Sequence, residues 1–224
     1  HSNDAHCISN NHIFTLYCDR KGRMWIGTFG GGLDLAIKEN NRYTFRHFFT
    51  KTFGQRRTRA IIEDSNGWIW VGNSDGVYVF SPDSLQADPQ NYLTYNYNNG
   101  KLRSNEIKCI YQDTQNRIWI GSSGGGLSMC IPGTDYHNLT FKHYGTSNGL
   151  VNDMVQAIAE DKQGNLWIAT EYGISRFNPE TQAFDNYFFS AYTLGNVYSD
   201  NSSCVSKNGS LLFGTNYGLL VINP

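Results

Sequence analysis

Hydrophobic and polar positions alternate in short runs along this chain, and the whole pattern returns with a period of 45 to 49 residues. Each repeat begins with an alternating run that ends in an acidic residue, crosses a polar turn and continues as an apolar run around a tryptophan. Four segments align without gaps over this first half of the repeat, and a weaker fifth keeps the register; they start at Ile13, Thr58, Ile107, Val155 and Asp200. Repeats of this length are typical of β-propeller blades.

Each repeat predicts four antiparallel strands, which we name A to D. Strand A is the alternating run and strand B carries the tryptophan, as in "IAEDKQGNLWIAT". A glycine-rich turn leads to strand C, which we expect from Val77 and from Ile174, and the segments "SPDS" and "NPET" predict turns into strand D. Strand D is expected from Tyr43 and from Leu139. Because no segment shows helical periodicity, the predicted fold class is all-β, with propeller blades of four antiparallel strands.

The repeat predicts four complete blades and a partial fifth. The expected boundaries are 1–12 for the end of a preceding blade and its linker, then 13–57, 58–106, 107–154, 155–199 and 200–224 for blades 1 to 5. We expect the fifth blade to lack its outer strand, and residues 1–11 not to replace it. The segment is therefore interpreted as an excerpt of a larger propeller, which forms an open arc or needs the missing blades. Exposed sheet edges invite association, so a homodimer is an open alternative.

Residues that occur once in every blade are interpreted as parts of the fold. The A–B turn has glycine or asparagine in one slot, where the backbone is expected to be left-handed, and the preceding aspartate can accept hydrogen bonds from the turn amides. Strand A has a small residue in one slot, as expected for the innermost strand, at Thr15, Ala60, Cys109, Ala157 and Ser202. The structural repeat residues are Asp19, Trp25, Asp64, Trp70, Asp113, Trp119, Asp161 and Trp167.

Charge and cysteine content narrow the possible partners. The net charge is −1, with 18 basic and 19 acidic side chains, which gives no excess charge for direct nucleic-acid binding. The longest apolar runs are too short to span a bilayer. Five scattered cysteines form no Cys-x-x-Cys pair, so we predict neither a metal site nor a cofactor, and their redox state stays open. Four of them lie in predicted strands, where a free thiol acts as a small hydrophobic residue.

The asparagine-rich linker followed by "IAEDKQGNLWIATEYGISRFNPETQAFDNY" closely resembles the two-component regulator propeller repeat, and residues 12–224 all fit it. The fifth repeat departs from the pattern, with Ser206 for aspartate and Leu212 for tryptophan. The resemblance implies the periplasmic sensor region of a hybrid two-component system whose parent is a histidine kinase. In that family such regions commonly sense oligosaccharides and control transcription of glycan-utilisation genes. The expected partners are an oligosaccharide, the remaining blades and the downstream sensor modules.

An enzyme built on a propeller is the strongest rival from another class. The segment "DKQGNLW" is similar to the Asp-box of sialidases, but Asp161 and Trp167 are six residues apart rather than five, and that hairpin is structural even in sialidases. The "GGG" segments lack the helix of a phosphate loop, and His47 and His143 share one slot on strand D. Because no nucleophile, base and carboxylate stand outside the repeat, we predict no catalytic residues. A protein–protein scaffold remains the main alternative function.

Ligand binding is expected where the blades differ from one another. The D–A linkers, the starts of strand A and the B–C turns fall at one end of the blades, and one strand A slot there reads Phe14, Arg59, Lys108, Gln156 and Asn201. We predict that the ligand-binding residues are Arg57, Arg59, Lys108, Gln156, Glu171 and Tyr172. Arg57, Arg59 and Lys108 are expected to converge near the channel mouth of blades 2 and 3. Clustered cations on a nearly neutral chain suggest an anionic partner, such as a sulfated or uronic oligosaccharide.

Overall fold

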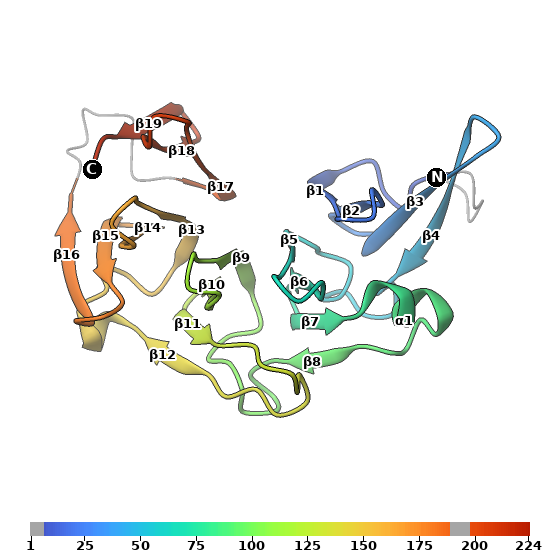
Figure 1. The fold of residues 1–224 in the computed structure, drawn as a ribbon, viewed down its shortest axis with the longest axis horizontal. Helices are drawn as coiled ribbons and strands as arrows, with labels where there is room; N and C mark the ends of the chain where they lie inside the picture. The colour runs from blue at the N-terminus through green and yellow to red at the C-terminus, as the bar shows by residue number, and fades with distance from the viewer. Residues whose placement is uncertain (1–6, 189–197) are drawn as a thin grey trace. The chain divides into compact units, whose positions relative to one another are not determined.

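The computed structural model describes residues 7–188 and 198–224 and consists of five antiparallel sheets (Figure 1). The chain divides into two compact units, and each is described by itself. The first holds residues up to Asn96 together with Asn105–Ile107, and the second holds Tyr97–Ser104 and the chain from Lys108 onward. Within every sheet the strands are ordered as they follow along the chain, so each sheet is a simple meander. The predicted all-β propeller-blade fold is confirmed.

The first unit contains two four-stranded sheets. The sheet of blade 1 comprises β1 (Ile13–Cys18), β2 (Met24–Thr28), β3 (Leu33–Glu39) and β4 (Arg42–Phe48), and that of blade 2 comprises β5 (Ala60–Glu63), β6 (Ile69–Asn73), β7 (Gly76–Phe80) and β8 (Leu93–Tyr95). A short helix, α1 (Pro82–Ala87), joins β7 to β8.

The second unit contains two four-stranded sheets and one of three strands. Blade 3 comprises β9 (Ile107–Gln112), β10 (Ile118–Ser122), β11 (Gly126–Cys130) and β12 (Lys142–Tyr144), followed by the 3-10 turn η1 (Thr146–Asn148). Blade 4 comprises β13 (Val155–Glu160), β14 (Leu166–Thr170), β15 (Gly173–Asn178) and β16 (Ala183–Tyr187), and blade 5 comprises β17 (Tyr198–Val205), β18 (Leu211–Thr215) and β19 (Gly218–Ile222).

Two details of the predicted strands are wrong. The expected turn at "SPDS" is the start of helix α1, because Pro82 is compatible with the first helical turn and Leu85 buries its side chain completely. The expected strand D from Leu139 is reduced to the three residues of β12. Among the described residues the fifth sheet has three strands and no outer strand, as predicted. Residues 7–11 form no strand, and the rest of the predicted non-replacing segment, residues 1–6, lies outside the described residues.

The predicted A–B turn is confirmed atom by atom. In each of the four complete blades one aspartate oxygen accepts a hydrogen bond from the indole Nε1 of the tryptophan, at 2.7–2.9 Å. The other oxygen accepts two turn amides; for Asp113 these are the amides of Gln115 and Arg117. The intervening slot has a left-handed backbone, with φ between 62° and 83° at Gly22, Gly67, Asn116 and Gly164. Aspartate and tryptophan are therefore parts of the hairpin itself.

Neighbouring blades within a unit are joined by packed aromatic rings. The ring of Trp25 lies 5.6 Å from that of Phe80 on strand C of the next blade, and Trp119 lies 5.7 Å from Phe177 in the same relation. Both tryptophans are completely buried. A Cβ added at Gly27 would lie 2.9 Å from the backbone oxygen of Thr58, so the chain just before β5 of the next blade packs closely against β2. The tryptophan slot therefore builds the blade-to-blade core.

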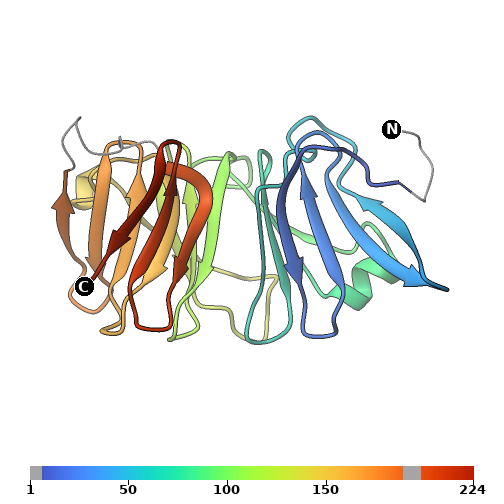
Figure 2. The ribbon, with the colours of Figure 1, turned by 90° about the horizontal axis from the view of Figure 1, so that it is seen from above.

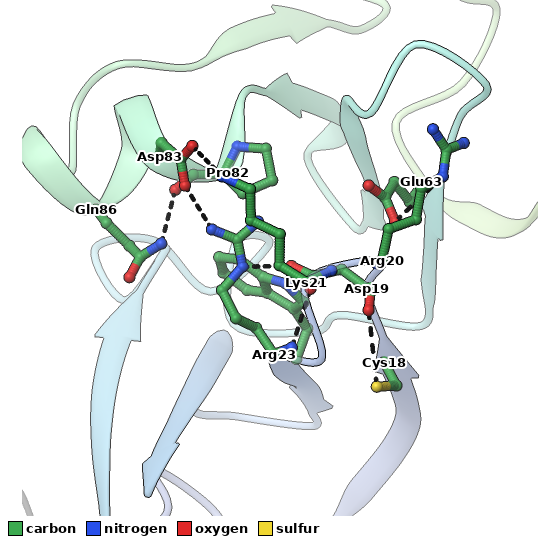
Figure 3. Close-up of polar contacts among 10 residues, drawn as sticks. Cys18, Asp19, Arg20, Lys21, Arg23, Glu63, Pro82, Asp83 and Gln86 are labelled. Carbon is green, nitrogen blue, oxygen red and sulfur yellow. Dashed lines mark hydrogen bonds and ion pairs between the residues drawn. The ribbon is translucent and has the colours of Figure 1, made fainter. Parts of the chain in front are cut away.

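Ion pairs at the ends of the A–B turns also connect neighbouring blades (Figure 3). Arg23 binds Asp19 of its own turn at 2.6 Å and Asp83 of helix α1 in the next blade at 2.6 Å. Lys21 also reaches Asp83, at 2.6 Å. The second unit repeats the arrangement, since Arg117 binds Asp113 at 2.5 Å and Glu180 of the next blade at 3.2 Å.

Candidate ligand-binding site

The strands of each unit run between two ends, where their connections gather (Figure 2). We call the end formed by the D–A linkers and B–C turns the linker rim, and the end formed by the A–B and C–D turns the hairpin rim. In the first unit the linker rim comprises residues 29–32, 49–58 and 74–75. In the second unit it comprises residues 97–104, 123–125, 145–154, 171–172, 188 and 216–217.

Backbone hydrogen bonds hold the linker rim in the same way in both units. In the first unit the amides of Gly30 and Gly32 donate to the carbonyl of Arg56, and in the second those of Gly124 and Gly126 donate to the carbonyl of Asp153. Next to each of these clips lies an isolated antiparallel bridge, Phe29 to Arg57 in one unit and Ser123 to Met154 in the other. The backbone therefore repeats, while the two side chains at the bridge do not.

In the first unit, Arg57 makes cation–π contacts with two phenylalanine rings. Its guanidinium carbon is 4.5 Å from the ring centre of Phe29 and 4.0 Å from that of Phe53. Phe14 meets Phe29 edge to face at 5.2 Å. Phe53 and Phe14 are 69% and 50% exposed, so this cluster opens to solvent. The Nε of Arg57 is buried and has no hydrogen-bond partner.

The neighbouring Arg59 is differently placed. Its side chain is buried, with Nη1 donating to Ser74 Oγ at 2.7 Å and Nη2 paired with Glu106 Oε1 at 2.7 Å. Its guanidinium also lies 5.8 Å from the ring of Phe14. The charge of Arg59 is thus already compensated within the first unit. Arg59 and Arg57 contact the same phenylalanine cluster, Arg59 through Phe14 and Arg57 through Phe29.

The remaining predicted residues lie in the second unit. Lys108 pairs with Asp200 at 3.1 Å, a contact from β9 to β17. Gln156 lies on β13, and its Oε1 is buried with no hydrogen-bond partner. Glu171 and Tyr172 are exposed on the B–C turn of blade 4, where the ring of Tyr172 lies 6.1 Å from that of Phe188. The six predicted residues are therefore divided between the units, with two in the first and four in the second.

Sequence reasoning missed the aromatic part of the linker rim. Phe29, Phe53 and Phe188 were not among the predicted site residues, although Phe53 directly precedes "GQRRTR". The chain has 13 phenylalanines and 14 tyrosines, most of which could as well belong to the core. The available signal is position, since these residues lie outside the alternating strand pattern.

Titratable groups with shifted pKa values lie mainly in the sheets. Burial raises the pKa of Tyr198 to about 12, and burial together with the nearby charge of Glu160 raises that of Tyr111 to about 12. Burial, with Arg103 nearby, lowers the pKa of His143, whose Nδ1 lies 2.9 Å from Ser128 Oγ. These shifts follow from packing in the strands. Within residues 7–188 and 198–224, no three histidine, cysteine or acidic side chains gather as metal ligands.

Cysteines were predicted to act as small hydrophobic residues in the strands. Cys109 and Cys130 are buried, and burial strongly raises the pKa of the Cys109 thiol. Cys18 and Cys204 also lie in strands but are exposed, so the prediction is wrong for these two. All five cysteines are free thiols.

Comparison with known sequences identifies the repeats. The family profile described as two component regulator propeller matches residues 7–30, 53–75, 101–124 and 149–172. Each matched stretch runs from a D–A linker to the B–C turn. A curated relative, Histidine kinase P4 from Formosa agariphila, is 24% identical over 204 residues, which cover 90% of this chain and 14% of the relative.

Solved structures of similar fold point to the same kind of protein. The extracellular domain assigned to the hybrid two-component system BT3049 of B. thetaiotaomicron superposes with a TM-score of 0.79 at 28% identity, over 95% of this chain and 28% of that one. That of BT4673 from the same organism gives a TM-score of 0.77 at 24% identity, over 96% of this chain and 30% of that one. This chain thus spans less than a third of those domains.

An enzyme also shares the fold. Virginiamycin B lyase from Staphylococcus aureus superposes with a TM-score of 0.69 at 13% identity, over 99% of this chain and 69% of the lyase. At this identity the likeness shows the fold alone.

No helix in the described part of the chain is long and apolar enough to cross a membrane.

Proposed function

Because this chain is a run of two-component regulator propeller repeats, the kind that forms the sensor domain of hybrid two-component systems, we propose that it senses oligosaccharides at its linker rim. The sensor would lie in the periplasm and belong to a histidine kinase parent that controls glycan-utilisation genes. The chain itself would bind and report a ligand, with no catalytic step of its own.

The observation that carries this proposal is that, in each unit, exposed aromatic rings lie mainly at the D–A linkers, the B–C turns and the first residues of strand A. Six of the eight exposed aromatic residues of the described chain lie there: Phe14, Phe53, Tyr97, Tyr172, Phe188 and Tyr217. Tyr43 on β4 and Tyr187 on β16 are the other two. Aromatic faces accompanied by a few polar and charged groups are typical of sites that bind small polar ligands.

The polar groups beside these rings suit a sugar. Arg57 and Gln156 each have a buried polar atom with no hydrogen-bond partner, and Glu171 is exposed next to Tyr172. In the second unit a sugar hydroxyl can donate to the lone amide oxygen of Gln156, and in the first unit the acidic group of a sugar can accept from the guanidinium of Arg57. We propose Arg57, Gln156, Glu171 and Tyr172 as residues that contact ligands.

The test combines binding with signalling. The whole sensor region is titrated calorimetrically with neutral and anionic oligosaccharides of equal length, and autophosphorylation of the full-length kinase is measured with each. At least one oligosaccharide class should bind and change the autophosphorylation rate. Tyr172→Ala should weaken that binding by between about twofold and tenfold, the range of an aromatic contact. The matched control is Tyr43→Ala, which removes an exposed tyrosine on β4 next to the C–D turn.

A protein partner is the alternative outcome of the same test. Exposed aromatic rings with arginine are also typical of protein–protein hot spots. If no oligosaccharide of either class binds, and kinase output does not respond, oligosaccharide sensing is excluded for this rim.

A further inference from the structure

Arg57 differs from the other cations of the linker rim in what surrounds it. Its guanidinium carbon lies over two phenylalanine rings, 4.5 Å from one ring centre and 4.0 Å from the other. Cation–π contacts of this kind restrain the guanidinium and leave its terminal N–H edges for polar contacts. Those edges form a planar fork that matches an oxyanion with two oxygens.

The charge of Arg57 is not compensated within the described chain. It makes no ion pair with any described residue, whereas Arg59 is paired with Glu106 and Lys108 with Asp200. Its Nε is buried without a hydrogen-bond partner. A buried charged donor without a partner is costly and calls for an explanation. A ligand oxyanion beside the guanidinium would supply the missing negative charge.

Folding of the blade does not require this arrangement. The equivalent bridge in the second unit is made by Ser123 and Met154, with the same backbone clip beside it. Neither the guanidinium nor the ring of Phe29 therefore has a counterpart in that unit. The first-unit pair is an addition to the repeat.

The geometry points to an anion-binding subsite at Arg57, which takes the carboxylate or sulfate group of an acidic sugar; this inference rests on the proposed oligosaccharide function. The guanidinium edge binds the oxyanion, and the exposed rings of Phe53 and Phe14 receive the apolar face of the sugar. Arg59 and Lys108 are positioning and structural cations, because their charges are already used.

The first experiment measures affinity in the whole sensor region. The probes are a uronic-acid trisaccharide, a sulfated trisaccharide and a neutral trisaccharide of the same length. Arg57→Ala should weaken binding of the preferred anionic probe about tenfold or more and leave the neutral probe unchanged. Arg57→Lys, which keeps the charge but loses the planar fork, should also weaken it. Arg56→Ala removes the adjacent exposed arginine, whose Nε donates to the carbonyl of Thr50, and is the matched control.

The second experiment separates the subsite from sugar binding in general. The Arg57 Nε–H resonance, assigned by its loss in Arg57→Lys, is followed by NMR during titration with inorganic sulfate, glucuronate and methyl glucoside. Sulfate or glucuronate should shift this resonance and methyl glucoside should not. A preference between the two anions identifies the oxyanion.

The outcomes distinguish the two proposals. If oligosaccharides bind but Arg57→Ala binds the anionic probes like wild type, the subsite is wrong and the sensing function stands. If no anion shifts the Arg57 resonance, the subsite is overturned whatever the calorimetry shows. If sulfate shifts the resonance and no trisaccharide binds, the anion subsite stands and oligosaccharide sensing fails.

Discussion

The two rims of these blades repeat in different ways. At the hairpin rim the same side chains recur with the same hydrogen bonds, so that Asp19 holds Trp25 at 2.9 Å and Asp113 holds Trp119 at 2.7 Å. At the linker rim the backbone recurs together with one side chain, the hydroxyl that ends strand B and donates to the B–C turn, while the side chains of the adjoining bridge vary. The carbonyls of Arg56 and Asp153 accept equivalent glycine amides, yet the adjoining bridge is Phe29–Arg57 in one unit and Ser123–Met154 in the other.

This difference distinguishes the side chains that the fold requires from those that it does not require. Side chains that repeat in every blade satisfy demands that every blade shares, namely a closed hairpin and a packed neighbour. Where the backbone and the repeated hydroxyl close the B–C turn, the other side chains of the linker rim are not needed for the fold and can bind a ligand. Mutations at the hairpin rim should therefore change stability, and mutations at the linker rim should change binding.

The largest effect is expected from Trp119→Ala. Trp119 is completely buried, bonded to Asp113 and packed on Phe177, so the substitution leaves a cavity and an aspartate oxygen without its indole donor. We expect a loss of roughly 3–5 kcal/mol in the free energy of unfolding, measured by urea denaturation. A variant as stable as wild type that had lost ligand binding would contradict the structural role.

Trp167→Ala allows a comparison between two tryptophans, Trp119 and Trp167, that occupy the same position in the repeat. Trp167 stacks on Tyr187 and borders a cleft of about 690 Å³ beside residues 220–224. Because one side of this ring already faces a cleft, its removal should cost less than that of Trp119. Equal losses for the two variants would mean that neighbour packing does not set the cost.

A smaller, pH-dependent effect is expected from Asp19→Asn. Burial alone would raise the pKa of Asp19, but hydrogen bonds from Trp25 and Arg23 outweigh it and hold the pKa below its ordinary value of 3.8. The substitution removes the charge and places amide hydrogens against donors, at a cost of roughly 1–3 kcal/mol at pH 7. Unfolding is measured by urea denaturation from pH 7 to pH 2.5.

The sign of the pH dependence follows from the lowered pKa. The ionised carboxylate stabilises the folded state fully above the unfolded-state pKa, near 4, and this stabilisation is lost as the pH falls through the lower folded-state pKa. The gap between wild type and Asp19→Asn should therefore narrow in acid. Asp185→Asn, at an exposed carboxylate on β16, serves as the control. A gap that is constant down to pH 2.5 would show that Asp19 acts through shape and not through its charge.

The fold was predictable because the demands of the hairpin rim are local. An aspartate, a left-handed glycine and a tryptophan six residues after the aspartate are close in sequence, so the sequence itself records their contacts. Strand ends were less predictable: Leu139 is apolar and buried but lies outside β12. There the burial of a side chain, rather than pairing of the backbone, satisfies the hydrophobic pattern.

The linker rim was predictable only as a region. Variation between blades identified Arg57 and Arg59 alike, because both break the repeat. Which of them keeps an unpaired charge depends on contacts such as Arg59 with Glu106, 47 residues further along the chain. Such pairings are tertiary and leave no local pattern.

The smallest effect is expected for the Lys108–Asp200 pair, and it decides which role Lys108 has. The pair is partly buried, at 3.1 Å, with 18% and 32% of the two side chains exposed. A double-mutant cycle of Lys108→Ala and Asp200→Ala should give a coupling energy of about 0.2–1 kcal/mol, typical of partly screened ion pairs. If the role of Lys108 is to pair with Asp200, Asp200→Asn lowers the stability slightly and leaves the affinity for an anionic trisaccharide unchanged. If Lys108 binds the ligand, as the sequence predicts, Asp200→Asn releases its charge and strengthens that affinity. We expect the first result, because the lysine charge is already compensated, and an increase in affinity would restore Lys108 to the binding site.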